Sequence, residues 1–153
     1  MAHKNRNIGS ISSGTMRSED LIPTFIYELK RQRPMRRQHK QLVRDVEQRM
    51  ESDDYYSGDD ASDDLESLFD ALGEYAPEHF YFGSHVGDGA DYGFWLCESW
   101  EEQLQDDGGI KVDGIEEIPA DHIGDVAIIG DHGNVSLYRR GRNHHLHEVW
   151  SVV

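Results

Sequence analysis

The hydrophobic pattern of this chain changes period at Pro77, and no other feature constrains the fold as strongly. Before Pro77 the apolar residues recur every three or four positions, as on one face of a helix, and after it they alternate as on a strand. Helices that come first and strands that follow are typical of an α+β fold rather than of βαβ units. We therefore expect N-terminal helices packed on a C-terminal antiparallel β-sheet that forms a meander.

The first half of the chain predicts three helices. Asp20 is the expected N-cap of the first, over residues 19–33, which places Pro23 in the first turn, where a proline is tolerated. The second helix follows Pro34 and forms a hairpin with the first, with basic outer faces. The third starts at Ser62, which is its expected N-cap.

The second half predicts five strands, with a short helix over 99–105 and a turn at Gly133-Asn134. The expected strands are 79–83, 92–97, 126–129, 135–139 and 146–152. If one face of the sheet packs on the helices, side chains at alternate positions are buried. The residues expected in this core are Phe80, Phe82, Phe94, Leu96, Ile128, Leu137 and Trp150.

A chain of 153 residues suggests one domain. Residues 1–17 are polar and lack periodicity, so we expect a disordered tail there, followed by a single α+β domain over 18–153. Asp, Ser, Gly and Tyr dominate residues 51–61, which predicts a flexible acidic linker between the second and third helices.

The formal net charge is −15, and it is distributed unevenly. Residues 1–50 carry 11 Lys/Arg and 5 Asp/Glu, a net charge of +6, whereas the remaining residues carry 4 Lys/Arg and 25 Asp/Glu, a net charge of −21. Such asymmetry indicates an electrostatic partner, or two parts that fold against each other. The stretch 51–78 has 11 Asp/Glu and no Lys/Arg, so it either imitates the phosphates of DNA or forms a solvated linker and helix face.

The single cysteine, Cys97, is unable to form an internal disulfide, which suits a reducing cytoplasm. The N-terminus lacks the apolar run of a signal peptide, and no stretch approaches the roughly 18 apolar residues of a membrane span. We therefore expect a cytoplasmic protein without a membrane partner, and we predict no oligomeric state.

The glycine-rich segment 83–91 lies between two aromatic strands. Glycine frees the backbone for turns and for the close approach of a ligand, and aromatic rings beside polar groups are common in contact sites. The alternative is a hairpin connection in which an aspartate only caps the turn. The candidate binding residues are His85, Asp88, Asp91, Tyr92 and Trp95.

The helical hairpin over 30–49 is rich in Arg and Lys, which is the usual electrostatic footprint of a surface that binds phosphates. The alternative is that these cations pair with acidic residues of the same chain or form a solvated face. The candidate basic patch consists of Arg31, Arg33, Arg36, Arg37, Lys40 and Arg44.

Three histidines near the C-terminus, His132, His145 and His147, are candidate metal ligands because neutral imidazoles two positions apart on a strand chelate transition metals. A polar strand face is the alternative, since no cysteine or second spaced pair lies nearby. No Ser or Cys has the setting of a nucleophile, and no carboxylate pair has that of an acid and base. The sequence therefore predicts no catalytic residue and no cofactor.

Four segments of the chain have a recognisable combined pattern: 20–25 (DLIPTF), 81–95 (YFGSHVGDGADYGFW), 131–140 (DHGNVSLYRR) and 147–153 (HEVWSVV). Together they resemble a family of small uncharacterised proteins carried by bacteriophages and plasmids, over most of the chain after Met16. The resemblance carries over no functional residues. It implies an accessory protein of a mobile element that acts in a host cytoplasm.

The leading hypothesis is a non-enzymatic phage or plasmid accessory protein that binds a host protein, such as a defence or nucleic-acid-processing factor, through an acidic surface. The first alternative is a nucleic-acid-binding accessory protein that uses the basic hairpin 30–49. The second alternative is a metal-dependent enzyme that uses His85, Asp88, Asp91 and the C-terminal histidines.

Overall fold

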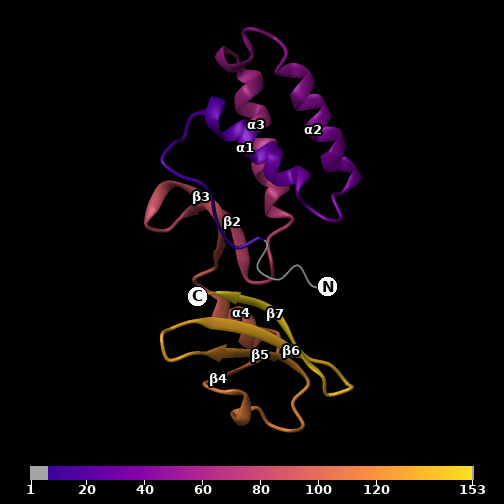
Figure 1. Cartoon of the computed structure of the whole chain (residues 1–153), viewed down its shortest axis with the longest axis vertical. Coiled ribbons are helices and arrows are strands. Elements are labelled where there is room, and N and C mark those ends of the chain that lie inside the picture. The colour runs from indigo at the N-terminus through magenta and orange to yellow at the C-terminus, as the bar shows by residue number, and fades with distance from the viewer. Residues whose placement is uncertain (1–6, 153) are drawn as a thin grey trace. The chain divides into compact units, whose positions relative to one another are not determined.

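Figure 1 shows the computed structural model of the chain, which describes residues 7–152. Contacts between residues divide the chain into two compact units. The helical unit comprises Gly9–Trp95, and the C-terminal unit comprises Leu96–Val153 together with Met1–Ile8. Each unit has a β-sheet of its own. That residues 18–153 form a single domain stays a prediction.

The helical unit contains α1 (Ser18–Lys30), α2 (Arg37–Arg49), the 3-10 helix η1 (Tyr55–Ser57) and α3 (Asp59–Gly73). The helices α1, α2 and α3 each contact the other two (Figure 1). Over residues 7–152, no helix combines the length and the apolar character that crossing a membrane requires.

Both predicted N-caps lie inside their helices. The backbone N–H of Leu21 already donates to the carbonyl of Arg17 at 2.9 Å, so α1 begins before Asp20 and the cap position is Arg17. Pro23 consequently lies within α1 rather than in its first turn. Ser62 likewise lies inside α3. The N-cap of that helix is Gly58, whose backbone is extended, so the helix starts before Ser62.

The segment 51–61, expected to be a flexible linker, contains a buried anchor. Tyr55 of η1 is 4% exposed, and its hydroxyl donates to the carboxylate of Asp64 at 2.9 Å. The same carboxylate accepts two hydrogen bonds from the Arg49 guanidinium, at 2.9 and 2.7 Å. This Asp64 network, made of Arg49, Tyr55 and Asp64, joins α2, η1 and α3. The hydrogen bond from Arg49 to Asp64 also raises the pKa of the guanidinium.

The stability that Tyr55 contributes is expected to fall in alkaline solution. Burial, and then the hydrogen bond to Asp64, raises the pKa of Tyr55 above its ordinary value of 10.0. Above that pH the unfolded chain releases the phenolic proton while the folded chain retains it, so the contribution falls by about 1.4 kcal/mol per pH unit until the raised pKa is reached.

Urea unfolding at pH values on both sides of 10.0 measures this effect. We expect the stability advantage of the wild type over Tyr55→Phe to be constant below that pH and to shrink above it. Tyr27→Phe is the control, since Tyr27 is 64% exposed. An advantage over Tyr55→Phe that stays constant at all pH values contradicts the prediction.

His39 joins α2 to the end of α3. Its Nε2 lies 2.7 Å from a carboxylate oxygen of Glu74, and its Nδ1 lies 2.7 Å from the hydroxyl of Tyr75. Because the carboxylate accepts only, Nε2 carries the proton in the neutral ring and Nδ1 accepts from the Tyr75 hydroxyl. The Tyr75 oxygen in turn accepts the backbone N–H of Arg36 at 2.9 Å. Every polar group of the buried imidazole is therefore satisfied, which gives His39 a structural role.

The sheet of the helical unit has the order β1-β3-β2, formed by β1 (Gly9–Ser12), β2 (Phe80–His85) and β3 (Asp88–Leu96). β1 falls in the region expected to be a disordered tail, but it pairs antiparallel with β3. The pairing is close, because a Cβ added to Gly93 of β3 meets the backbone oxygen of Gly9 at 2.2 Å. Backbone hydrogen bonds to β3 thus order a segment that buries little apolar area. Residues 1–6 of the expected tail lie outside the described residues.

Aromatic rings connect the helices and the sheet of the helical unit. Phe82 of β2 contacts Phe25 of α1 and Phe69 of α3 edge to face, with ring centroids 5.3 and 5.2 Å apart. Phe82 also packs against Phe94 of β3 at 5.0 Å. Edge-to-face pairs at these distances are favourable beyond the area they bury. The core of this unit therefore lies between α1, α3 and the two long strands.

The C-terminal unit contains α4 (Trp100–Asp106), β4 (Ile110–Val112), the 3-10 helix η2 (Ile115–Glu117), β5 (Gly124–Ile129), β6 (Val135–Arg140) and β7 (Leu146–Val152). Its sheet has the order β4-β5-β6-β7. β5, β6 and β7 are antiparallel neighbours, as predicted, whereas β4 pairs parallel with β5. The prediction of one antiparallel meander is wrong in this respect, and also because the strands expected at 79–83 and 92–97 pair within the other sheet. The α+β content is as predicted.

The core predicted from strand alternation is largely confirmed. Five of the expected residues are buried, namely Phe80, Phe82, Phe94, Leu137 and Trp150. Leu96 and Ile128 are half-buried. In the C-terminal unit, Leu137 of β6 and Trp150 of β7 are opposite each other in the sheet. Both side chains are buried, so they belong to the core of that unit.

Candidate functional site

The glycine-rich segment 83–91 is a tight hairpin. β2 and β3 are adjacent strands, and only Val86 and Gly87 separate them. The carboxylate of Asp88 accepts the backbone N–H of Ala90 at 3.0 Å, and that of Asp91 accepts the hydroxyl of Ser10 on β1. Both carboxylates are therefore hydrogen-bonded within the fold. The turn-capping alternative applies to Asp88, because an aspartate bonds readily to a backbone amide two residues on.

Two further candidate residues, His85 and Trp95, also form hydrogen bonds within this hairpin. Nδ1 of His85 accepts the backbone N–H of Gly87 at 2.9 Å, and the Trp95 indole donates to the carbonyl of Gly83 at 2.9 Å. The His85 and Trp95 rings meet edge to face with centroids 4.7 Å apart. These contacts stabilise the hairpin and leave no convergent set of free polar groups. The fifth candidate, Tyr92, contacts the helices instead: its ring meets Phe25 of α1 and Phe69 of α3 edge to face.

The basic hairpin is partly neutralised by the chain itself. Arg31 pairs with Glu28 and Arg36 with Glu74, each at 2.7 Å. Arg33 donates to carbonyls at the end of α1, which satisfies backbone acceptors that the helix leaves open. Lys30 and Arg49, outside the candidate patch, also have carboxylate partners. The interpretation of these residues as intrachain ion-pair partners is thus correct for part of the patch.

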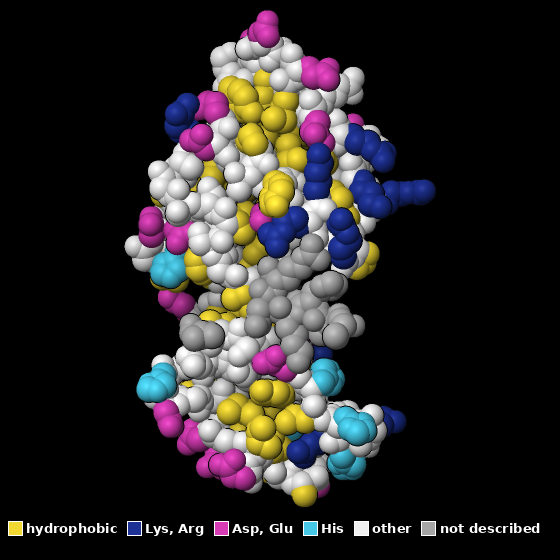
Figure 2. All heavy atoms as spheres, viewed as in Figure 1, with side chains coloured by type: hydrophobic (Ala, Val, Ile, Leu, Met, Phe, Trp, Pro, Cys, Tyr) yellow, Lys and Arg dark blue, Asp and Glu magenta, His cyan; other side chains and the backbone are white. Residues whose placement is uncertain are grey.

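Three candidate cations remain on one side of α2. Arg37, Lys40 and Arg44 are exposed, and none of them has a carboxylate partner among residues 7–152. Their spacing of three and four positions places them on one face of the helix. Figure 2 shows Lys and Arg side chains gathered along the side of the helical unit where Figure 1 places α2.

The candidate metal ligands do not converge. His132 lies in the turn between β5 and β6, His145 precedes β7, and His147 is exposed on β7. Within either unit, taken over residues 7–152, no three side chains of His, Cys, Asp or Glu bring ligand atoms together. Of the three, only His147 lies on a strand, so the expected pair of imidazoles two positions apart on one strand is not formed.

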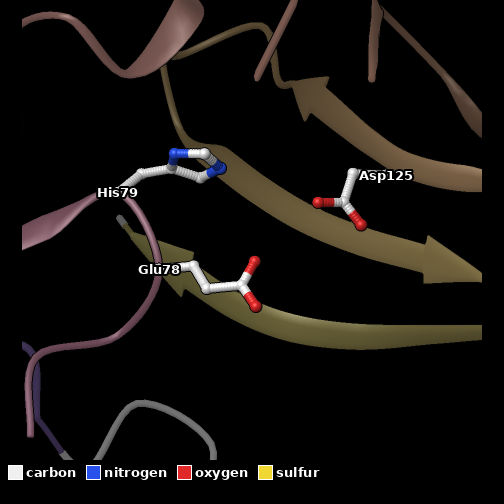
Figure 3. A group of neighbouring side chains, drawn as sticks. All are labelled: Glu78, His79 and Asp125. Atoms are coloured by element: carbon white, nitrogen blue, oxygen red, sulfur yellow. The ribbon is translucent and has the colours of Figure 1, made fainter. Parts of the chain in front are cut away.

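Two acidic residues and a histidine are drawn in Figure 3, and they belong to different units. Glu78 and His79 lie on the segment that leads into β2 of the helical unit, whereas Asp125 lies on β5 of the C-terminal unit. Within its own sheet, Asp125 accepts two hydrogen bonds from Arg139 on β6, at 2.6 and 3.0 Å. That bidentate pair is explained by the register, since the two residues face each other across the strands.

A row of exposed carboxylates lies along α3 of the helical unit. Asp59, Asp63, Glu66 and Asp70 follow one another at steps of four, three and four, which places them on one side of the helix over about 16 Å. All four are exposed, and none forms an ion pair with another residue of the described chain. We call these four residues the acidic face.

A pocket of about 220 Å³ adjoins the acidic face within the helical unit. We call it the α1–α3 pocket; it is lined by Leu21 and Phe25 of α1, by Ser62, Leu65, Glu66 and Phe69 of α3, and by Tyr92 of β3. Its volume is below the roughly 300 Å³ at which pockets for small molecules begin. Its lining is mostly apolar, and no hydrogen bond joins the hydroxyl, phenol and carboxylate that border it. The arrangement therefore suits contact with a side chain better than catalysis.

Comparison of the chain with protein-family models, with curated proteins and with solved structures gives no match.

Proposed function

We propose that this chain is a non-enzymatic accessory protein of a bacteriophage or plasmid, which binds a basic surface of a host protein through the acidic face of α3. The host cytoplasm is the proposed location, and a defence or nucleic-acid-processing factor is the proposed kind of partner. The phage or plasmid origin is proposed from the sequence resemblance. The observation that supports binding is the row of four exposed carboxylates that have no cationic partner among residues 7–152.

The energetics of α3 support an external partner. Each neighbouring pair on the acidic face is a like-charge pair at three or four residues, and each destabilises a helix by roughly 0.2 to 0.5 kcal/mol. The helical unit as a whole has 9 Lys/Arg and 18 Asp/Glu. The candidate cations without a carboxylate partner among its described residues, Arg37, Lys40 and Arg44, lie on α2 and not on α3. A cationic partner removes this repulsion when it binds, and the negative field also accelerates its association.

Nucleic-acid binding through Arg37, Lys40 and Arg44 is the second candidate function. The observation that favours it is that these three cations are exposed on one face of α2 and have no carboxylate partner in the part of the chain that the structure describes. Three phosphate contacts give only a weak attraction at moderate salt, with a slope of log K against log salt of roughly −3. The net negative charge of the helical unit opposes it further, so we rank it below protein binding.

Capture of bacterial proteins on the immobilised full chain tests the proposed function. The test variant, Asp59→Asn/Asp63→Asn/Asp70→Asn, removes three charges from the acidic face without changing side-chain size. The control variant, Glu102→Gln/Asp106→Asn/Asp121→Asn, removes three exposed charges from the C-terminal unit. We expect the wild type and the control to capture the same nuclease-resistant proteins, and the test variant to bind them at least tenfold more weakly.

Two outcomes contradict the proposal. Equal capture by the test variant and the wild type shows that the acidic face is not the binding surface. Capture that disappears after nuclease treatment, and that is also lost in Arg37→Gln/Lys40→Gln/Arg44→Gln, favours nucleic-acid binding through α2 instead.

A further inference from the structure

The α1–α3 pocket and the acidic face share a residue. Glu66 lines the pocket and is also the third carboxylate of the acidic face. On α3 the pocket residues 62, 65, 66 and 69 follow helical spacing, so they form a stripe parallel and next to the stripe of carboxylates. A partner that contacts the carboxylates therefore has an apolar depression directly beside them.

The residues that line the pocket differ in burial. Leu21 and Phe25 are fully buried, whereas Leu65, Phe69 and Tyr92 are half-buried. The volume of about 220 Å³ holds one large side chain. Filling the pocket removes apolar surface of the walls from water as well as that of the incoming side chain, which favours binding.

The aromatic walls indicate the kind of side chain. The rings of Phe25, Phe69 and Tyr92 line the pocket, with centroids 5.8 to 6.4 Å apart. The Tyr92 ring meets both phenylalanine rings edge to face, whereas the two phenylalanine rings are tilted at 52° to each other. Rings packed edge to face in this way accept a further ring in the same geometry, which adds to the gain from area alone. An aromatic side chain thus fits this lining better than a branched aliphatic one.

We propose that the α1–α3 pocket is the anchor site of the partner, and that it takes one aromatic side chain of a segment in which Arg or Lys residues flank that aromatic. The inference rests on the proposed function, because the charge of the acidic face is what selects cationic flanks. It adds the sequence chemistry of the partner's segment. The aromatic side chain occupies the pocket, and the flanking cations contact Glu66 and its neighbours on the acidic face.

Two synthetic peptides test this inference directly. One has a phenylalanine between two pairs of arginines and carries a fluorescent label, and the other has alanine in place of the phenylalanine. Binding of each to the full-length chain is measured by fluorescence anisotropy at low ionic strength. We expect the phenylalanine peptide to bind about tenfold more tightly than the alanine peptide, from the area that one aromatic ring buries.

A pair of matched variants locates the effect. Ser62→Phe places a ring of the chain itself at the pocket, whereas Ser67→Phe places one on the exposed surface of the same helix, outside the lining. We expect Ser62→Phe to abolish the preference for the phenylalanine peptide and Ser67→Phe to retain it. Circular dichroism melts of both variants show whether the helical unit is still folded, and Leu65→Ala, which widens the pocket, provides a second test if Ser62→Phe does not fold.

The outcomes separate this inference from the proposed function. Equal binding of both peptides, weakened by the triple Asn variant of the acidic face, overturns the pocket and leaves the acidic binding surface in place. A phenylalanine preference that persists in folded Ser62→Phe also overturns the pocket. Failure of both peptides to bind overturns the proposed function as well. A phenylalanine preference that is lost in Ser62→Phe but insensitive to the triple Asn variant supports the pocket and overturns the acidic face.

Discussion

Replacing Asp64 with alanine is expected to lower the free energy of unfolding of the helical unit by about 3 kcal/mol, the low end of the cost of breaking a buried ion pair. The side chain of Asp64 is 8% exposed and satisfies both Arg49 and Tyr55. Its removal leaves the buried hydroxyl of Tyr55 without an acceptor. The side chain of Arg49 is 40% exposed, so its guanidinium recovers part of its hydration, which keeps the loss near that low end.

Asp63→Ala is the matched control for this change. Asp63 lies on the same turn of α3 and carries the same charge, but it is exposed and has no ion-pair partner in the described chain. A surface substitution of this kind is expected to change the stability by no more than about 0.5 kcal/mol. Urea unfolding followed by circular dichroism measures both variants, and equal losses in the two contradict a special role for the Asp64 network.

Gly93→Ala is the second substitution with a large expected effect, a loss of roughly 2 to 3 kcal/mol from overpacking. An added Cβ meets the backbone oxygen of Gly9 at 2.2 Å and the backbone of Ser10 at 2.8 Å, both on β1. Backbone atoms are unable to move aside as a flexible side chain does, so β1 has to separate from β3. Gly89→Ala is the control, because the space around Gly89 in the same strand is open.

A chain that begins at Met16 makes this test specific. It lacks β1, so the added Cβ no longer has a neighbour to strike, and Gly93→Ala is expected to cost little in that background. Shortening by itself is expected to destabilise the helical unit, in contrast to the expectation for a disordered tail. Thermal melts of the four combinations give the coupling between β1 and Gly93. If Gly93→Ala is equally costly with and without residues 1–15, the pairing of β1 with β3 is not the cause.

The elements that the sequence predicts well are those with local signals. β6 has Val135 and Leu137, and β7 has Trp150 and Val152, as apolar residues at alternate positions. Gly133-Asn134 marks the turn before β6, so the positions of both strands follow from nearby residues. The predicted starts of α1 and α3 agree less well with the structure, although Asp20 and Ser62 are good N-cap residues in general. The hydrogen-bond ladder of each helix extends before them, and a suitable side chain inside a helix does not end it.

The parts that depend on distant residues were not predicted. β1 has four residues without a clear alternation, and only its partner β3 makes it a strand. β4, which has three residues, is a strand because it pairs with β5. The division into two units is of the same kind, since no break in composition at Leu96 marks it. Such pairings are decided by tertiary contacts that override local propensity.

The candidate site shows the same distinction. The spacing of Asp59, Asp63, Glu66 and Asp70 is visible in the sequence, and a helical reading of 51–78 finds the acidic face. The α1–α3 pocket is not visible there, because Tyr92 lies far along the chain from the helices whose rings it meets. For the hairpin 83–91, the turn itself explains Asp88, whose carboxylate accepts the backbone N–H of Ala90, and binding by this segment stays a prediction.

The position of β1 has a consequence for synthesis of the protein on the ribosome. Ser10 of β1 emerges first, but its partner Asp91 lies 81 residues further along the chain. At roughly 5 to 20 residues per second, β1 waits on the order of 4 to 16 s for the strand it pairs with. The three helices leave the ribosome within that interval and can associate, because all their residues precede β2. Closure of the sheet is therefore the last step of the helical unit, and until then the backbone of β1 is available to chaperones or to other nascent chains.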